Sequence, residues 1–512
     1  MNNLLAEHFD SICKKNWNDN ALIIDGKKFK FSELYNYSNI IACILKTKIK
    51  KNDTVAIYAE KDIKVFASII ACIKSGNPYS IIDINSPIKR IDMMFKTLKP
   101  KLILYNLKNN ISKKIPSINL NKINLVKKKS QVEYAKTIPS CPIYIMFTSG
   151  STGVPKGVAI SSQNILNFIN WAKNTYNIKS GVIQSNLNPL HFDNSIFDIY
   201  GGLFNGSTLV TFKQKDLLDP SKILKVFLKE KINIWFSVPS LIIFFMKFGF
   251  FEKKKFLNLK KIIFGGEGFP KNKLLELFKI MNKNIDLINV YGPTECTCIC
   301  SSYKITNNDF LKNEKKRYAP FGSKLSDYFY FYIVKEKSNG RLVLSNRGEL
   351  LIGGPNVGLG YYNNSSETDK KFIQNPFNNK YTDIVYRSGD LVYKDKRNDK
   401  IYFSSRIDDQ IKFQGYRIEL LEIEQAISQI KGLEENCVLL SKINGNPKII
   451  SFIVTNLNLE KIKNELKKSL PKYMIPSEFL YVSKLEKNNN GKIDRIKTFK
   501  KNYGKRNQKN PD

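Results

Sequence analysis

Short hydrophobic runs alternate along this chain with stretches in which hydrophobic and polar positions follow a helical period. Residues 54–58 and 261–264 are compact apolar runs of the kind that form buried strands, whereas residues 274–278 belong to an amphipathic helical stretch. Continuous apolar strands separated by helices are typical of parallel sheets that are covered on both faces. The pattern predicts an α/β fold with layered, largely parallel sheets.

A polar stretch at residues 404–409 separates this long α/β region from a final segment with a pattern of its own. There, residues 416–424 predict the start of a helix, and residues 437–440 and 449–454 predict strands. We therefore expect three parts. They are a large domain over residues 1–404, a small α+β domain over 405–498, and a disordered, Lys- and Asn-rich tail over 499–512. A large and a small domain joined by a polar hinge suit closure over a ligand.

One segment is apolar over about the twenty residues that a membrane span requires, namely residues 232–251. Polar residues and Pro239 interrupt it, so the pattern favours a buried strand that leads into a helix. The first residues do not show the basic-then-apolar pattern of a secretory signal. We expect a protein without a membrane span.

The composition is that of a globular protein, with 42% hydrophobic and 25% charged residues among 512. The net charge of +38 is the outlying value and on its own would suggest a nucleic-acid or membrane partner. The excess of Lys is spread along the chain together with Asn and Ile, as codon bias in an A+T-rich genome would produce. A nucleic-acid surface would instead favour clustered Arg. We therefore expect no nucleic-acid partner and no membrane insertion.

The eight cysteines are scattered except for Cys296, Cys298 and Cys300. Such a chain is not a disulfide scaffold, so we expect a reducing cytoplasm. The alternate spacing of these three predicts one face of a buried strand. A zinc site would usually have two to four residues between its ligands, so it is the less favoured interpretation.

The strongest chemical motif begins where the predicted strand 144–147 ends, with Thr148-Ser149-Gly150-Ser151-Thr152-Gly153-Val154-Pro155-Lys156-Gly157. Glycines, hydroxyl groups and one lysine in so short a loop are suited to surrounding a polyphosphate. The motif is not a Walker A loop, because no Ser or Thr follows a Gly-Lys pair at the required spacing. A flexible Ser/Gly linker is the alternative, but linkers do not follow buried strands so closely.

With this loop, the chain resembles the adenylate-forming (AMP-binding) family, which includes amino-acid adenylation domains, acyl-CoA synthetases and luciferases. Further family motifs follow in the family's order, at residues 291–295, 348–354, 386–391, 406–424 and 490–495. The resemblance implies a large adenylation domain of layered α/β sheets with a β-rich subdomain, a small mobile α+β domain, and ATP with Mg²⁺ as cofactors. The ATP-binding residues that it implies are Thr148, Ser149, Gly150, Ser151, Thr152, Gly153, Lys156, Gly266, Glu267, Asn289, Val290, Tyr291, Gly292, Pro293, Thr294, Asp390 and Arg406.

The resemblance also gives individual roles. Glu295 and Thr152 are expected to hold Mg²⁺, since a carboxylate beside phosphates needs a bridging cation. Asp390 is expected to bind the ribose diol, with a helix or turn cap as the alternative. Lys492 is the expected catalytic residue, bridging the substrate carboxylate and the α-phosphate, although any Lys in this chain is by default a surface charge. A proline that many relatives have just before the Lys492 motif is absent, and Ser405 replaces a common glycine.

Asp193 matches the family position at which amino-acid-activating members pair a carboxylate with the substrate ammonium group. Its alternative role is an N-cap for a helix starting near Ser195. Neighbouring segments look like those of free-standing D-alanine:carrier-protein ligases, which favours D-alanine or a similar amino acid. Those ligases usually have Cys where this chain has Gly265, so we expect a larger pocket here. The remaining pocket residues expected are Phe197, Ile263 and Cys298, with Lys492 reaching the substrate carboxylate.

The chain ends soon after Lys492, so we expect a separate phosphopantetheinylated carrier protein rather than a fused one. Asp408 is the expected hinge of the small domain, with a solvated linker charge as the alternative. Two other functions stay open at this point. One is a CoA ligase for another carboxylic acid, which would give Asp193 no ammonium partner. The other is a basic nucleic-acid-binding protein.

Overall fold

The computed structural model of the protein describes residues 3–124, 132–150, 153–251, 256–281, 285–311, 318–322, 328–443, 446–487 and 493–503. These residues form two compact units. The first unit comprises Met1–Ile84, Thr97–Phe147 and Gly157–Ile407, and the second comprises Asn85–Lys96, Thr148–Lys156 and Asp408–Asp512.

An eight-stranded sheet in the first unit is parallel except at its two edges. The edge strands β2 and β14 pair in antiparallel fashion with β1 and β13. Its strands, in spatial order, are β14 (Ser301–Lys304), β13 (Asp286–Tyr291), β12 (Lys261–Phe264), β11 (Ile234–Ser237), β9 (Ile183–Asn186), β10 (Thr208–Thr211), β1 (Asn20–Ile24) and β2 (Lys27–Lys30).

A seven-stranded sheet of the first unit has four parallel strand pairs among β3 to β7, and β18 joins its edge in antiparallel fashion. Its spatial order is β18 (Gly360–Tyr361), β8 (Lys156–Ser161), β7 (Pro142–Thr148), β4 (Tyr79–Ile81), β3 (Val55–Tyr58), β5 (Leu102–Tyr105) and β6 (Ser117–Asn119). The apolar runs that predicted β3, β7 and β12 are buried strands, so the expected α/β layering is confirmed.

The third large sheet of this unit is antiparallel, as expected of a β-rich subdomain. It contains β16 (Leu342–Leu344), β15 (Tyr330–Glu336), β17 (Arg347–Gly353), β20 (Ile384–Asp395) and β19 (Phe372–Gln374), with β21 (Lys400–Arg406) paired to β20. Because Ser405 and Arg406 are part of β21, the predicted domain boundary at 404/405 falls inside a strand. The structure divides the chain after this strand, between Ile407 and Asp408.

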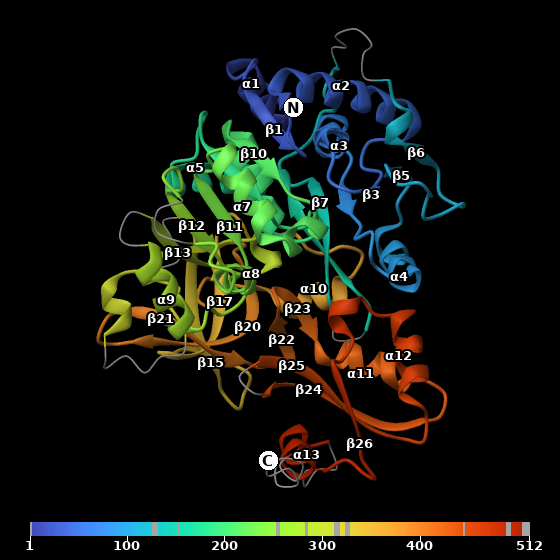
Figure 1. Ribbon diagram of the computed structural model, residues 1–512, viewed down its shortest axis with the longest axis vertical. Helices are drawn as coiled ribbons and strands as arrows, with labels where there is room; N and C mark the ends of the chain where they lie inside the picture. Colours follow the sequence, from blue (N-terminus) through green and yellow to red (C-terminus); the bar gives the residue numbers. More distant parts are fainter. Residues whose placement is uncertain are drawn as a thin grey trace. The chain divides into compact units, whose positions relative to one another are not determined.

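The helices supply apolar faces that bury the two large α/β sheets. In α3 nearly every residue is buried, and α2 lies beside it (Figure 1). The principal helices outside the C-terminal domain are α1 (Leu4–Lys15), α2 (Phe31–Lys48), α3 (Ile63–Ser75), α4 (Ile88–Leu98), α5 (Ser162–Tyr176), α6 (Asn194–Ile196), α7 (Pro220–Lys229), α8 (Pro239–Met246), α9 (Lys271–Met281) and α10 (Ser365–Lys371).

The C-terminal part of the second unit is a small α+β domain. Strand β25 (Asn446–Thr455) is central, antiparallel to β24 (Leu433–Ile443) and parallel to β26 (Glu478–Tyr481). The other elements are the hairpin β22 (Gln410–Phe413) and β23 (Tyr416–Glu419), and the helices α11 (Leu420–Ser428), α12 (Leu459–Lys467) and α13 (Arg495–Tyr503).

Two sequence-based expectations for this domain need correction. The segment 416–424 begins as strand β23, and the helix starts only at Leu420, because Tyr416–Glu419 pairs with β22. The predicted disordered tail begins too early, because α13 continues to Tyr503 and Phe499 packs against Phe452 in the core of the domain.

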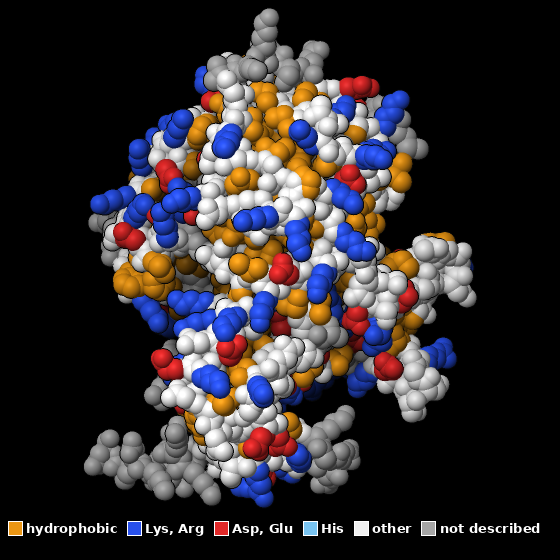
Figure 2. Space-filling model, turned by 90° about the vertical axis from the view of Figure 1, so that its right-hand side faces the viewer, with side chains coloured by type: hydrophobic (Ala, Val, Ile, Leu, Met, Phe, Trp, Pro, Cys, Tyr) orange, Lys and Arg blue, Asp and Glu red, His pale blue; other side chains and the backbone are white. Residues whose placement is uncertain are grey.

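The apolar segment 232–251 contains strand β11, which is fully buried, followed by helix α8. This confirms the predicted strand and helix. Across the described parts of the chain, each helix is too short or too polar to cross a membrane. Lys and Arg side chains on the face shown in Figure 2 are dispersed among hydrophobic, acidic and uncharged groups rather than gathered into one patch.

Candidate active site

The described residues of the predicted phosphate loop, on either side of residues 151 and 152, lie between β7 and β8. A Cβ on Gly150 would lie 2.0 Å from the carbonyl oxygen of Val154, so only glycine fits there. Gly153 has a φ of +71°, a backbone conformation that glycine adopts without strain. Its N–H donates a hydrogen bond to the Gly150 carbonyl oxygen at 3.0 Å. These close contacts among the described loop residues argue against the alternative of a flexible linker.

The polar residues of this loop that the structure describes lie at its two ends. Thr148 is the last residue of β7, and Lys156 is the first residue of β8. Ser149 is buried, and its hydroxyl donates to the backbone oxygen of Arg417 at 2.9 Å. The predicted residues Ser151 and Thr152 lie outside the described part of the chain.

Asp390 contacts two other predicted nucleotide-binding residues. It lies within β20 directly opposite Arg406 of β21, and Arg406 donates from Nη1 to Asp390 Oδ1 at 2.8 Å. Tyr291, at the end of β13, donates its hydroxyl to Asp390 Oδ2 at 2.5 Å. Burial first, and the Asp390 charge next, raise the pKa of Tyr291, so this phenol remains a donor. Since Asp390 is inside a strand, the alternative of a helix or turn cap is wrong.

The turn after β13 places Glu295 in the interior. Gly292 allows this turn to fold closely, because a Cβ there would lie 2.3 Å from the carbonyl oxygen of Cys298. Pro293 precedes the short 3-10 helix Thr294–Cys296. The Glu295 side chain is completely buried and accepts a hydrogen bond from the Tyr361 hydroxyl at 2.8 Å.

Asp193 precedes the short helix α6, but its side chain makes no capping hydrogen bond. The alternative role as an N-cap is therefore wrong. Its Oδ2 atom instead accepts a hydrogen bond from Thr294 Oγ1 at 2.5 Å. A residue predicted to bind the amino acid thus touches one predicted to bind ATP.

The residues of the predicted side-chain pocket are apolar, but the space beside Gly265 is not as we expected. We expected Gly265 to leave extra space, yet a Cβ there would lie 2.5 Å from the carbonyl oxygen of Val290 and 2.6 Å from its Cγ2 atom. This expectation is wrong, because Val290 already occupies the volume next to Gly265. Phe197 and Ile263 are completely buried, and the Phe197 ring packs edge-on against Tyr176 at 5.3 Å between centroids.

Cys296, Cys298 and Cys300 are all buried, as predicted, but they do not form a strand. Cys296 ends the 3-10 helix, Cys298 has a φ of +73°, and β14 begins only after Cys300. Burial, followed by the charges of Asp193 and Asp198, raises the pKa of Cys298, so this thiol stays protonated. The described residues contain no cluster of three or more His, Cys, Asp or Glu side chains suited to a metal.

Two of three other predicted ATP-binding residues make hydrogen bonds within the protein, and the third turns the chain. Glu267 accepts a hydrogen bond from the backbone N–H of Ser240 at 2.7 Å, which caps the start of α8. Asn289 donates to the carbonyl oxygen of Pro320 at 2.9 Å. Gly266 has a φ of +86°, which turns the chain after β12. Their roles toward ATP stay predictions.

Of the predicted hinge and catalytic residues, the structure describes only the hinge residue, Asp408. Asp408 is the first residue of the C-terminal part of the second unit, at the division of the chain. Lys492 lies outside the described residues. Lys487 and Ile493, on either side of the Lys492 segment, pair as an isolated antiparallel bridge.

Two residues with contacts to this site were not singled out from the sequence. Tyr361 holds Glu295 from a strand far along the chain, and nothing in the local sequence marks that pairing. Asp198 is completely buried and accepts side-chain hydrogen bonds from Asn186 and Asn188. Nothing in the local sequence marks the pairing of Asp198 with these two asparagines.

Comparison with known proteins identifies the family. Residues 9–362 match the model of the AMP-binding enzyme family. The chain belongs to this family. An AMP-binding enzyme named D-alanine--D-alanyl carrier protein ligase, from Bacillus licheniformis, is 31% identical over 93% of this chain and 95% of its own length.

Other relatives are much longer than this AMP-binding enzyme. Gramicidin S synthase 2 from Brevibacillus brevis is 30% identical over 96% of this chain, but the match spans only 11% of that protein. Among solved structures, an artificially fused adenylation-PCP di-domain protein from Klebsiella oxytoca aligns with a TM-score of 0.80 at 21% identity, covering 93% of each chain. That likeness establishes the fold.

Proposed function

We propose that this AMP-binding enzyme activates a small amino acid, D-alanine or one of similar size, and loads it onto a separate carrier protein. The observation that carries the proposal is the carboxylate of Asp193. It is not used as a helix cap, it is partly exposed, and Thr294 of the family motif at residues 291–295 donates a hydrogen bond to one of its oxygens. A carboxylate so placed suits an ammonium group, because the two opposite charges can form a charge-assisted hydrogen bond.

Two steps make up the proposed reaction. In the first, a carboxylate oxygen of the amino acid attacks the α-phosphorus of ATP, the bond to the β-phosphate oxygen breaks, and aminoacyl-AMP and pyrophosphate form. In the second, the phosphopantetheine thiol of the carrier loses its proton and attacks the carbonyl carbon, and AMP leaves. Phosphoryl transfer of this kind depends mainly on positioning and charge stabilisation.

The chain's own residues supply that positioning. Backbone N–H groups and hydroxyls of the loop after β7 would bind the phosphates. Asp390, oriented by Tyr291 and Arg406, would accept hydrogen bonds from the ribose hydroxyls. Lys492 would place its ammonium group between the substrate carboxylate and the α-phosphate.

Glu295 fits the proposed role in binding Mg²⁺. This cation usually keeps several waters and takes one or two protein carboxylates together with substrate phosphates, so a single buried carboxylate is sufficient. Glu295 is such a group, and its hydrogen bond from Tyr361 orients it. When bound, Mg²⁺ would neutralise phosphate charge. Thr152 is the second proposed ligand.

The proposed pocket and partner follow from the same residues and relatives. Phe197, Ile263 and Cys298 are buried and apolar, and Val290 fills the space beside Gly265, which supports a small side chain. The D-alanyl carrier protein ligase relative supports a carrier protein as acceptor. All eight cysteines are free, which supports the proposed cytoplasmic location.

The test is ATP–pyrophosphate exchange across D- and L-amino acids, with the matching acids that lack the amine as controls. We expect exchange with D-alanine or another small amino acid and none with propionate. Exchange with amine-free acids alone would assign a CoA ligase instead. Loading of a phosphopantetheinylated carrier, measured by mass spectrometry, tests the second step.

A further inference from the structure

A buried carboxylate with no part in the proposed function lies on the helical turn just after Asp193. Asp198 belongs to the π-helical turn Phe197–Gly202 and is completely inaccessible to solvent. π-helical turns are rare and occur often at functional sites. A buried carboxylate is costly unless hydrogen bonds satisfy it, so its partners show what it holds in place.

Those partners lie on the other side of Asp193 in the sequence. Asp198 Oδ2 accepts hydrogen bonds from Asn186 Nδ2 at 2.8 Å and from Asn188 Nδ2 at 3.2 Å. Asn186 is the last residue of β9, and Asn188 lies in the loop that follows it. Asp198 therefore ties together the two ends of the segment 186–198, and Asp193 lies inside this closed segment.

The same segment is fixed to its surroundings at further points. Lys61 Nζ donates to the backbone oxygen of Asn186 at 2.8 Å, and Asn188 Nδ2 also contacts the carbonyl oxygen of Phe236 at 3.2 Å. Ser195 fixes the turn around Asp193. Its hydroxyl donates to the carbonyl oxygens of Leu190 at 3.0 Å and Phe192 at 2.7 Å.

We propose that Asp198 is a positioning residue for amino-acid recognition, which holds the segment 186–198 so that the Asp193 carboxylate faces the substrate ammonium group. Asp198 acts through Asp193 and does not touch substrate. The inference rests on the proposed function, because it requires that Asp193 bind an ammonium group. A displacement of the order of 1 Å in a positioned group can reduce activity about 100-fold, so fixing the segment 186–198 should affect amino-acid activation.

The charge of Asp198 has little part in this role. Burial raises the pKa of Asp198 to about 7, although the two asparagine amides oppose the shift. Its Oδ1 atom has no hydrogen-bond partner within the described residues, so both bonds to the segment use Oδ2 alone. An amide oxygen in the place of Oδ2 can accept the same two hydrogen bonds.

The main experiment compares Asp198→Ala with wild type in ATP–pyrophosphate exchange. We expect D198A to raise the KM for the amino acid about 10-fold or more, because it removes the acceptor of both hydrogen bonds that hold the segment. The KM for ATP should change by less than about 2-fold, because the side-chain partners of Asp198, Asn186 and Asn188, are not among the residues proposed to bind ATP. An equal rise in both KM values would overturn the proposal.

Asp198→Asn is the conservative control. It keeps an acceptor at the position of Oδ2, so the KM for the amino acid should stay within about 3-fold of wild type. If D198N were as impaired as D198A, the charge rather than the hydrogen-bonded segment would matter, and the proposal would be wrong.

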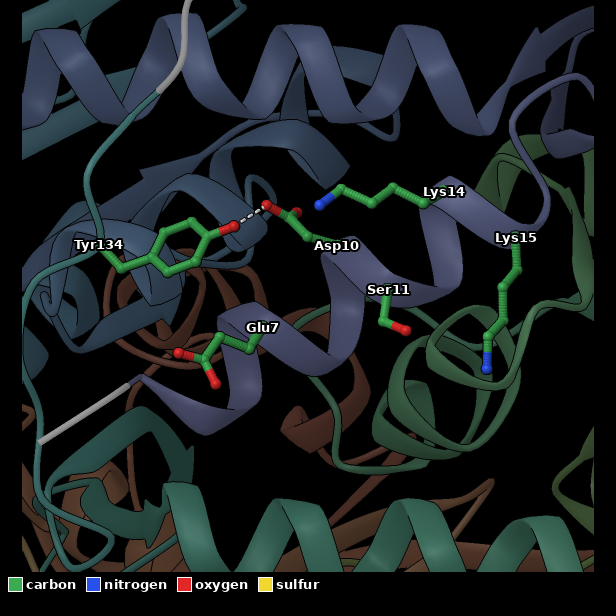
Figure 3. A pocket seen from close by; sticks show the side chains of 6 residues that line it. All are labelled: Glu7, Asp10, Ser11, Lys14, Lys15 and Tyr134. Atoms are coloured by element: carbon green, nitrogen blue, oxygen red, sulfur yellow. Dashed lines mark hydrogen bonds between the residues drawn. The ribbon is translucent and has the colours of Figure 1, made fainter.

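Asp10→Ala is the matched control for losing a buried carboxylate. Asp10 lies on α1, where it accepts a hydrogen bond from Tyr134 (Figure 3). It also pairs with buried Lys74 at 2.7 Å. D10A should lower the melting temperature without a selective rise in the KM for the amino acid. A selective rise in D10A as well would show a general effect of destabilisation and overturn the proposal.

Asn188→Ala keeps the proposal testable if D198A does not fold, since it removes only one of the two hydrogen bonds to Asp198 Oδ2. N188A should also raise the KM for the amino acid selectively. In a D193A background, neither variant should have a further effect on that KM. Effects that persist there would exclude action through Asp193. If wild type activates no amino acid at all, the proposed function fails. If wild type activates an amino acid and these variants have the same KM values as wild type, only this inference fails.

Discussion

Three buried or partly buried carboxylates of the candidate site each accept a hydrogen bond from a hydroxyl group elsewhere in the chain. The pairs are Thr294 with Asp193, Tyr291 with Asp390, and Tyr361 with Glu295. A hydroxyl fixes the orientation of a carboxylate without neutralising its charge. Each carboxylate is thus oriented before any substrate binds, which lowers the cost of reorganisation during reaction.

For Asp193→Ala we predict a selective loss of amino-acid activation. Only the substrate ammonium group loses its partner, so kcat/KM for the amino acid should fall by an amount equivalent to about 2 to 4 kcal/mol. Nucleotide binding, measured by calorimetry, should be nearly unchanged. D193N is the matched variant, since it keeps an acceptor for Thr294 but loses the charge. Full activity of D193N would contradict the ammonium role.

Lys492→Ala should abolish adenylation with little change in stability. The lysine charge is used as negative charge develops on the α-phosphate and as pyrophosphate leaves, whereas ground-state binding of ATP depends mainly on other groups. Single-turnover formation of aminoacyl-AMP is the measurement. The exposed Lys484 supplies the matched control, because K484A removes the same charge from the same domain. Near-normal adenylate formation by K492A would remove Lys492 from the mechanism.

At the scale of elements, the sequence predicted what depends on local pattern. Strands β3, β7, β11 and β12 and the helix after β11 could be found because each is a compact apolar run with clear boundaries. Strand β23 was mistaken for the start of a helix, because its pairing with β22 decides its conformation.

The candidate site shows the same limit. Motif residues could be named, but which of them touch depends on pairing between distant segments. The Tyr361 contact to Glu295 and the Asn186 contact to Asp198 follow only from the fold. Alternate spacing likewise predicted a strand at Cys296 to Cys300, where a positive φ at Cys298 breaks the strand conformation.

Gly265 gives a prediction about how β12 and β13 pack. Because a Cβ at this position would overlap Val290, Gly265→Ala should reduce the free energy of unfolding by about 1 to 3 kcal/mol, as overpacked cores do. Urea unfolding followed by circular dichroism measures it. Gly265→Cys should lose at least as much, since the clash begins at Cβ. If both variants were as stable as wild type, the close approach of Val290 would be refuted.

At the scale of the whole molecule, the division at Asp408 separates residues that are proposed to act together in adenylation. Asp193, Asp390 and Glu295 belong to the first unit, and Lys492 belongs to the second. The net charge of +38 adds a general attraction for acidic partners, which include carrier proteins. A change of domain orientation between the two half-reactions is the behaviour that the family resemblance predicts for such a chain.

Asp408→Pro tests this hinge. Proline fixes φ near −65° and removes an N–H group, so it should restrict rotation but leave one orientation intact. We expect one half-reaction to fail selectively, when single-turnover adenylation is measured beside transfer to a carrier. D408A keeps the backbone free and should retain both half-reactions. Equal loss in both half-reactions, or in neither, would contradict the hinge role of Asp408.

The hydrogen bond from Thr294 to Asp193 has a thermodynamic consequence for the two substrates. Thr294 is the neighbour of Glu295 in the proposed nucleotide site, so any shift of this turn on nucleotide binding is transmitted to the carboxylate proposed to bind the amino acid. Linkage between two ligands is reciprocal. Whatever factor ATP contributes to the affinity for the amino acid, the amino acid must contribute to the affinity for ATP. In Thr294→Val, which lacks the hydroxyl, the two substrates should bind more nearly independently.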